Sequence, residues 1–447
     1  MGAARHQAGV GCLQAGRWPF NLRRVTVVGL GRTGRALVDQ LARWGVDVFV
    51  TEARELSAGE RAQLTARQVR WEEGGHTEAA LDCDLMVSSP GVPPHAPPLC
   101  WAAARNITVW SEVELAFRLA DPGVVIAVTG TDGKSTTCSL VGAILASAGL
   151  EPVVAGNIGR PAVSTVAEVA GRPWVLEVSS YQLEWTEVFR PHVAVWLNFA
   201  PDHLDHHRSL AAYFAAKARI LARQCRDDVA VMNAAVAARL APRGRLVTYP
   251  EIRLPPGWKA DIAAHLLLDL QAAWSAACAV RPALAVAPPP FESVRGALAQ
   301  PNRLEVVGTL GGITFINDSK ATNAHATGAA LRALPGPLVL ILGGRHKGIG
   351  YDDLAPLLRA KVRSCVLVGE AQEFFARLLD GWGVPYVRAG APADALAAAY
   401  RAANPGDTVL LSPACASFDQ FNSYAQRGAA YRAAFAQLSR RFTAGVR

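Results

Sequence analysis

Short apolar runs alternate with longer alanine-rich segments along most of the chain. The runs read VTVVGLG, VDVFVTE, DLMVSSPG, VVIAVTG, WVLEVSS, VAVWLN, PLVLILGG, SCVLVGE and TVLLSPA. Continuous apolar strands separated by helix-length segments are typical of parallel sheets that helices cover on both faces. The pattern therefore predicts an α/β fold built on parallel sheets.

Two breaks divide this pattern into blocks. LADPG, residues 119–123, precedes the strand that enters a lysine-containing loop, and residues 282–301 are rich in proline around APPPFES. A chain of 447 residues is also too long for a single hydrophobic core. We predict a flexible extension followed by three α/β domains, over residues 1–22, 23–120, 121–299 and 300–447.

Composition is that of an ordinary globular enzyme, with 51% apolar and 18% charged residues. No apolar run approaches the ~18–20 residues that cross a bilayer, and the N-terminal segment lacks the features of a signal peptide. The eight cysteines form no C-x-x-C pair, which favours reduced thiols. The net charge of +8 comes from dispersed arginines without a basic-aromatic cluster. We expect a cytoplasmic monomer that binds anionic small molecules and no nucleic acid.

A glycine turn opens the first block. The strand of residues 25–28 runs into GLGRTG, residues 29–34, and Glu52 closes the next strand. Glycines in a strand–turn–helix context let a diphosphate approach a helix N-terminus, which predicts a Rossmann-like domain. Three interpretations remain open: a dinucleotide site, a packing turn without a ligand, and a site for another nucleotide diphosphate.

A second glycine turn opens the middle block. The strand of residues 124–128 feeds TGTDGKSTT, residues 129–137, which is one glycine short of the usual phosphate-loop pattern. Backbone amides of such a turn can surround phosphate oxygens, while Lys134 neutralises them and a serine or threonine hydroxyl reaches Mg²⁺. The turn therefore predicts a nucleoside triphosphate site on a P-loop ATPase-type parallel sheet.

Acidic and imidazole groups follow two other strands of this block. Glu177 ends the strand of residues 174–178, and the strand of residues 193–198 leads into PDHLDHH, residues 201–207. Carboxyl ends of strands are where α/β sheets bind ligands. Mg²⁺ beside the triphosphate loop, zinc on His203, His206 and His207, and a solvated polar loop are all compatible with this pattern.

These motifs resemble the Mur ligase family, ATP-dependent enzymes that build the bacterial peptidoglycan precursor. In the middle block the resemblance is carried by TGTDGKSTT, GNIG, LEVSSYQLE and NFAPDHLDHH. In the last block it is carried by INDSKATN, GGRHKG and LSPACASFDQFNSYAQRG, which are similar to the branch of the family that adds D-glutamate. The resemblance extends from about residue 24 to the C-terminus, and it implies that the last domain is also Rossmann-like.

The resemblance implies a reaction between UDP-N-acetylmuramoyl-L-alanine, D-glutamate and ATP. The L-alanyl carboxylate would attack the γ-phosphate of ATP, and the amine of D-glutamate would then attack the resulting acyl phosphate. Lys134 and Mg²⁺ would offset the repulsion between the anionic groups. Two Mg²⁺ sites are implied.

The residues that the resemblance implies fall into four sets. The catalytic set is Lys134, Glu177, His203 and Lys217. The metal set is Ser135, Glu177, His203 and Lys217, with Lys217 carbamylated by CO₂. The ATP set is Gly130, Thr131, Asp132, Gly133, Lys134, Ser135, Thr136, Asp269, Arg303 and Asp318. The substrate sets are Gly31, Arg32, Thr33, Glu52, Arg54, Ser89, Pro90, Gly91, Asn157 and Ser179 for the UDP-linked substrate, and Thr322, Lys347, Ser417, Phe418 and Tyr424 for D-glutamate.

The chain departs from the family pattern around its nucleotides. Asp132 replaces the usual asparagine of the triphosphate loop, and HLLLD, residues 265–269, replaces H-N-x-x-N. Glu52 and Ala53 replace aspartate and threonine beside the expected uracil. Since the catalytic set is intact, these departures put nucleotide affinity and base selectivity in question more than the reaction.

Three other functions compete with this interpretation. An NAD-dependent oxidoreductase would use the first glycine turn, but it leaves the lysine loop and the last block unexplained. Folylpolyglutamate synthetase, a related amide ligase, normally begins close to its lysine loop, whereas here about 129 residues precede that loop. A non-catalytic nucleotide-binding protein has no need of Glu177, His203 and Lys217.

Overall fold

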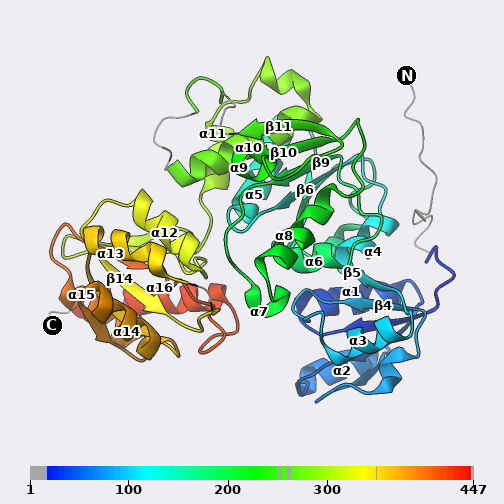
Figure 1. The fold of residues 1–447 in the computed structure, drawn as a ribbon, viewed down its shortest axis with the longest axis horizontal. Helices are drawn as coiled ribbons and strands as arrows, with labels where there is room; N and C mark the ends of the chain where they lie inside the picture. The colour runs from blue at the N-terminus through cyan, green and yellow to red at the C-terminus, as the bar shows by residue number, and fades with distance from the viewer. Residues whose placement is uncertain (1–17, 250–252, 259–261, 263, 349, 444–447) are drawn as a thin grey trace. The chain divides into compact units, whose positions relative to one another are not determined.

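The computed structural model describes residues 18–249, 253–258, 262, 264–348 and 350–443. Three sheets, each flanked by helices, make up the fold (Figure 1). The chain divides into two compact units. The first unit, which carries the N-terminal and central sheets, comprises Met1–Phe199, Ala211–Ala260 and Leu266–Arg295. The second unit, which carries the C-terminal sheet, comprises Ala200–Leu210, Asp261–His265 and Gly296–Arg447.

The N-terminal sheet is parallel, with strand order β3-β2-β1-β4-β5. Helix α1 packs through Leu37, Val38 and Leu41, whose spacing of three and four residues places them on one helical face. The elements are β1 (Arg24–Val28), α1 (Arg32–Arg43), β2 (Asp47–Thr51), α2 (Ala58–Ala66), β3 (Arg70–Glu72), η1 (Glu78–Leu81), β4 (Leu85–Ser88), α3 (Pro97–Ala104), β5 (Val109–Ser111) and α4 (Glu112–Leu119).

The central sheet is also parallel, with strand order β11-β10-β9-β6-β8-β7. Strand β6 lies between β8 and β9, so the strand order reverses direction beside β6. Open α/β sheets bind ligands at such a reversal point. The strands are β6 (Val124–Thr129), β7 (Val153–Gly156), β8 (Pro173–Glu177), β9 (Val193–Trp196), β10 (Val229–Asn233) and β11 (Arg245–Tyr249). The helices of this block are α5 (Lys134–Ser147), η2 (Ala162–Thr165), α6 (Ser180–Glu184), α7 (Leu204–His207), α8 (Leu210–Ala218), η3 (Arg219–Leu221), α9 (Ala234–Ala237), α10 (Ala264–Val280), η4 (Pro282–Ala285), α11 (Glu292–Arg295) and η5 (Gly296–Leu298).

The C-terminal sheet has strand order β12-β13-β17-β14-β15-β16. Strand β12 is antiparallel to β13, and the other pairs are parallel. The strands are β12 (Glu305–Leu310), β13 (Ile313–Asn317), β14 (Leu338–Gly343), β15 (Val362–Val368), β16 (Tyr386–Arg388) and β17 (Thr408–Leu411). The helices are α12 (Ala324–Ala333), η6 (Asp352–Leu354), α13 (Ala355–Lys361), α14 (Gln372–Trp382), α15 (Pro392–Ala402) and α16 (Tyr424–Thr443).

The predicted α/β fold with three sheets is confirmed. The antiparallel edge strand β12 is an addition that the apolar pattern did not predict. Residues 1–17 of the predicted extension lie outside the described residues, whereas Trp18 stacks on Trp44 with ring centroids 6.0 Å apart. Within the described ranges, every helix is too short or too polar to span a bilayer.

A buried carboxylate joins the N-terminal and central sheets of the first unit. Glu114 on α4 is fully buried and accepts hydrogen bonds from the backbone amides of residues 187–189 at 2.9–3.0 Å. Its fourth partner is the Arg118 guanidinium, 2.7 Å away and one helical turn along. Because α4 follows the N-terminal sheet and residues 187–189 precede β9, these bonds fix one sheet against the other.

We expect Glu114→Gln to lower the free energy of unfolding by about 2–4 kcal/mol, because the new amide group would face backbone N–H donors. Glu55→Gln provides the control. Glu55 is 76% exposed beside Arg61, so its substitution should change the free energy of unfolding by less than about 0.5 kcal/mol. Denaturant unfolding of both variants measures the difference. Equal stabilities would contradict the proposed role of Glu114.

Candidate nucleotide and substrate site

The turn between β6 and α5 requires glycine at two positions. Gly130 and Gly133 have φ angles of 157° and 85°. A Cβ atom on Gly133 would lie 2.2 Å from Oδ1 of Asp269, a buried residue of α10. Residues with a side chain would therefore be both strained and obstructed at this position. Asp269, predicted at the ATP site, is thus placed directly against the loop.

Asn198 holds this loop from the end of the neighbouring strand. Its Oδ1 accepts hydrogen bonds from the amides of Thr131, at 3.0 Å, and Asp132, at 2.9 Å. Its Nδ2 donates to the Asp132 carbonyl at 3.1 Å. Asn198 opens the NFAPDHLDHH motif, but the sequence alone assigns it no role. The loop is consequently fixed by β9 as well as by its own glycines.

Two lysines converge on one carbonyl of the loop. The Lys134 ammonium donates to the carbonyl oxygens of Gly130, at 2.9 Å, and Thr131, at 2.7 Å. Lys217, only 1% exposed, donates to the same Gly130 oxygen at 2.8 Å and lies over the Tyr213 ring. The structure therefore brings together the two predicted catalytic lysines, Lys134 and Lys217, which are far apart in the sequence.

Oxygen donors gather at the start of α5. Ser135 Oγ donates to Glu177 Oε2 at 2.5 Å, and Asn157 Nδ2 donates to Glu177 Oε1 at 2.8 Å. Ser135 and Glu177 are buried. A hydroxyl and a carboxylate are ligands that Mg²⁺ prefers, so this part of the predicted metal set fits the ion.

The N-terminal glycine turn is braced by its own domain. Glu52 Oε2 accepts a 2.6 Å hydrogen bond from the Leu30 amide, and Ser89 Oγ donates to the Gly29 carbonyl at 2.8 Å. A Cβ atom on Gly34 would lie 2.0 Å from the Gly29 carbonyl oxygen, so close packing requires glycine at position 34. Ser89 and Glu52, predicted in the UDP-linked site, therefore shape the turn.

Two predicted arginines of this site contact other parts of the first unit. The Arg32 guanidinium donates to the Asn157 carbonyl at 3.5 Å and so connects the glycine turn with the GNIG segment. Arg54 forms an ion pair with Glu60 at 2.6 Å. Hydrogen bonding to Glu60 raises the pKa of Arg54.

A buried aspartate organises the second unit. Asp202 Oδ1 lies 2.7 Å from the Lys347 ammonium, and Oδ2 accepts a 2.9 Å hydrogen bond from Asn323. His203 Nε2 lies 3.5 Å from Oδ2, and His203 has a φ angle of 55°. Burial alone would raise the pKa of Asp202, but the charges of His203 and Lys347 and the hydrogen bonds from Lys347 and Asn323 hold it below its usual range. Two predicted site residues thus share one carboxylate.

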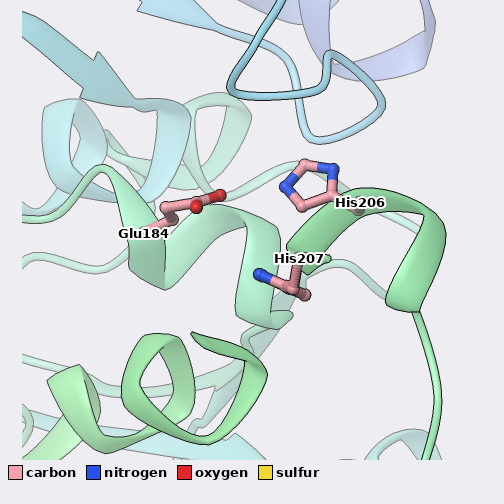
Figure 2. A group of neighbouring side chains, drawn as sticks. All are labelled: Glu184, His206 and His207. Atoms are coloured by element: carbon pink, nitrogen blue, oxygen red, sulfur yellow. The ribbon is translucent and has the colours of Figure 1, made fainter. Parts of the chain in front are cut away.

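The histidines that follow His203 lie on α7. Figure 2 shows His206 and His207 on that helix and Glu184 on α6. The two imidazole rings pack edge to face, with centroids 4.6 Å apart. Glu184 belongs to the first unit and both histidines to the second.

The remaining predicted residues of the second unit lie near β13 and the segment before α16. Asp318 accepts hydrogen bonds from Ser412 Oγ at 2.8 Å and from the Leu304 amide at 3.2 Å, which places it beside the loop that contains Arg303. Thr322 is half-buried and Ser417 buried, whereas Phe418 is 64% exposed and Tyr424 38% exposed. Phe418 and Tyr424 therefore present large surfaces to solvent.

A parallel sheet that feeds a glycine- and lysine-containing turn, with a serine–glutamate pair beside it, defines an α/β protein built to hold nucleotide phosphates. Three family models match the chain. They are the MurD N-terminal domain over residues 24–97, the Mur ligase middle domain over residues 128–249 and the glutamate ligase domain of Mur ligases over residues 302–415. The chain belongs to the Mur ligase family.

Curated relatives align over nearly the whole chain. The UDP-N-acetylmuramoylalanine–D-glutamate ligase of Salinibacter ruber is 40% identical over 448 residues, covering 92% of this chain and 96% of the relative. The enzyme of the same name from Acidobacterium capsulatum is 40% identical over 441 residues, covering 92% and 95%.

Solved structures share the fold at low sequence identity. The UDP-N-acetylmuramate-alanine ligase MurC of Thermotoga maritima has a TM-score of 0.57 at 16% identity, covering 93% of this chain and 100% of that one. MurF ligase of Thermotoga maritima, solved in complex with ADP, has a TM-score of 0.56 at 15% identity, covering 93% and 95%.

Asn198→Ala should loosen the turn between β6 and α5. We expect amide hydrogen exchange at Asp132 to accelerate about tenfold or more, because the side-chain acceptor is lost. Thr131 should respond less, since it keeps a 3.2 Å bond to the Asn198 carbonyl. Asn233→Ala, which removes an N-cap bond to Ala235 in the same sheet, is the matched control and should affect only α9. Unchanged exchange at Asp132 in Asn198→Ala would show that this side chain does not hold the turn.

Proposed function

We propose that this chain is an ATP-dependent ligase that joins D-glutamate to UDP-N-acetylmuramoyl-L-alanine, a cytoplasmic step in the synthesis of the peptidoglycan precursor. The observation that carries the proposal is the convergence of Lys134 and Lys217 on the Gly130 carbonyl, next to the Ser135–Glu177 pair. Membership in the Mur ligase family and the names of the aligned relatives support the same reaction. Family membership also favours a UDP-linked substrate over a dinucleotide at the N-terminal glycine turn.

The reaction has two steps. A carboxylate oxygen of the L-alanyl group attacks the γ-phosphorus of ATP, so that ADP leaves and an acyl phosphate forms. The amine nitrogen of D-glutamate then attacks the acyl carbon and loses a proton, and phosphate leaves with the former carboxylate oxygen. The Lys134 ammonium lies at the loop that would hold the triphosphate, so it would stabilise the charge that develops during transfer.

The proposed metal ligands are Ser135, Glu177, a carbamylated Lys217 and His203. Two Mg²⁺ ions held by such ligands would neutralise phosphate oxygens. The close Ser135–Glu177 contact supports the first of these sites.

The burial of Lys217 supports carbamylation, whereas its contacts with a carbonyl oxygen and an aromatic ring favour the ammonium form. Its ammonium is buried against the Tyr213 ring and the Gly130 carbonyl. Burial disfavours a charged amine, and a neutral amine can add CO₂ to give a carbamate and a proton. The carbamate would replace a cation beside the triphosphate loop with an anion able to bind metal.

The proposed substrate residues form two sets, one for the UDP-linked substrate and one for D-glutamate. Around the N-terminal turn and the GNIG segment, the residues for the UDP-linked substrate are Gly31, Arg32, Thr33, Glu52, Arg54, Ser89, Pro90, Gly91, Asn157 and Ser179. For D-glutamate they are Thr322, Lys347, Ser417, Phe418 and Tyr424. Lys347 is the proposed cation for a carboxylate of D-glutamate, and Asp202 holds its ammonium in place.

D-Glutamate should be the preferred acceptor. Because the chain aligns with relatives named for D-glutamate addition, we expect kcat/KM for D-alanine and lysine to be lower by about a hundredfold or more. The kcat/KM values for L-glutamate and diaminopimelate should be lowered by a similar factor. The measurement is ADP release with each amino acid and UDP-N-acetylmuramoyl-L-alanine. Comparable kcat/KM for lysine or diaminopimelate would contradict the D-glutamate assignment and leave the family membership intact.

Lys347→Ala should raise KM for D-glutamate by about tenfold or more and leave KM for ATP nearly unchanged. Since this change also leaves Asp202 without its ion pair, a second variant carries Asp202→Asn as well. The defect in D-glutamate use should persist in the double variant even where its stability recovers. Normal D-glutamate kinetics in the folded double variant would exclude Lys347 from the acceptor site.

Lys217→Ala should be nearly inactive, and acetate should restore part of its activity by supplying the missing carboxylate. Lys134→Ala provides the matched control, because it removes a cation that acetate cannot replace. The test compares initial rates of both variants with and without acetate. Full activity of Lys217→Ala without added acid would refute the carbamate.

A further inference from the structure

A second buried carboxylate, Glu112, lies where the N-terminal sheet meets the loops of the central sheet. Glu112 is the first residue of α4 and is fully buried. One of its oxygens accepts a 2.6 Å hydrogen bond from the Val163 amide of η2. The other accepts from Gln182 Nε2 on α6 at 3.4 Å. One side chain of α4 therefore contacts two separate segments of the central block.

The contact with Gln182 leads to Ser179. Gln182 Oε1 accepts hydrogen bonds from the amide and from the hydroxyl of Ser179, each at 3.0 Å. The Ser179 hydroxyl in turn accepts from the backbone amide of Gln182, which completes a capping box at the start of α6. Since the side-chain nitrogen of Gln182 donates to Glu112 and its side-chain oxygen accepts from Ser179, the orientation of the Gln182 amide group depends on the Glu112 carboxylate.

The contact with Val163 leads to Asn157. Helix η2 begins at Ala162, two residues after the GNIGR segment that carries Asn157. Asn157 is held at its other side by Glu177 and by Arg32. Fixing the start of η2 therefore fixes the end of the segment that presents Asn157.

We propose that Glu112 is a positioning residue for the UDP-linked substrate, because its carboxylate holds the segments that carry Asn157 and Ser179 in one fixed arrangement. This inference rests on the proposed assignment of those two residues to the substrate site. Glu112 itself is buried beneath these segments and acts through Val163 and Gln182. Its contribution is to substrate affinity rather than to phosphoryl transfer.

The ionised form of Glu112 is the one that suits these contacts. All of its hydrogen-bond partners are N–H donors, and a protonated carboxyl would turn an O–H toward them. Burial raises the pKa of Glu112 to about 7, while hydrogen bonds from Val163 and Gln182 and the charge of Arg32 lower it. The other charged side chains on α4 and on α6, which packs against it, are Glu114, Arg118 and Glu184. Glu112 therefore gains a proton as the pH falls through about 7.

The test is calorimetric binding of UDP-N-acetylmuramoyl-L-alanine to the full chain at pH 6 and pH 8. The substrate's diphosphate and carboxylate stay ionised over this range. Glu112→Gln should weaken binding about tenfold at pH 8 and make it independent of pH, while wild-type affinity falls toward that of the variant at pH 6. ATP affinity, measured in parallel, should be unchanged. Glu187→Gln is the control, because Glu187 also links α4 to the central block, through Arg118, without contacting these segments.

A reciprocal exchange separates positioning from general damage. In Glu112→Gln with Gln182→Glu, the donor and acceptor trade places and the contact is restored, so most of the affinity should return. Folded Glu112→Gln that binds the substrate as tightly as wild type at pH 8 would overturn the role of Glu112. Wild-type protein that binds no UDP-N-acetylmuramoyl-L-alanine would overturn the proposed substrate site together with this inference.

Discussion

The Gly130 carbonyl is the point on which the nucleotide site depends. Two ammonium groups, of Lys134 and Lys217, donate to this single oxygen, and the loop around it is held by Asn198. In the proposed function, a triphosphate at Lys134 would place anionic oxygens beside this carbonyl, and a carbamate would replace the Lys217 cation with an anion.

Buried carboxylates play three different parts in this fold. Glu114 fixes the N-terminal sheet to the central one by accepting from successive backbone amides. Glu112, on the same helix, extends that connection to the segments proposed to hold the UDP-linked substrate. In the second unit Asp202 pairs with Lys347, the residue proposed to hold a carboxylate of D-glutamate.

The sequence was sufficient for the fold class and for the local motifs. Long apolar strands such as β6 were predicted because both faces of a parallel sheet are covered, whereas β3, β5 and β16 are three-residue strands too short to show a pattern. The resemblance placed Ser135 and Glu177 in one metal set, and the structure brings their side chains into contact. The Asp202–Lys347 pair spans 145 positions, and the Glu112–Gln182 contact spans 70. Such pairs depend on tertiary packing, which spacing along the chain does not encode.

The central claim is that a substrate carboxylate is phosphorylated before the amide bond forms. Transfer of isotope tests it most directly. UDP-N-acetylmuramoyl-L-alanine labelled with ¹⁸O in its alanyl carboxylate would be turned over with ATP and D-glutamate, and the released phosphate analysed by mass spectrometry. One ¹⁸O atom is expected in each phosphate, since the bridging oxygen leaves with phosphorus. Phosphate that carries no label, formed together with the amide product, would contradict an acyl phosphate intermediate.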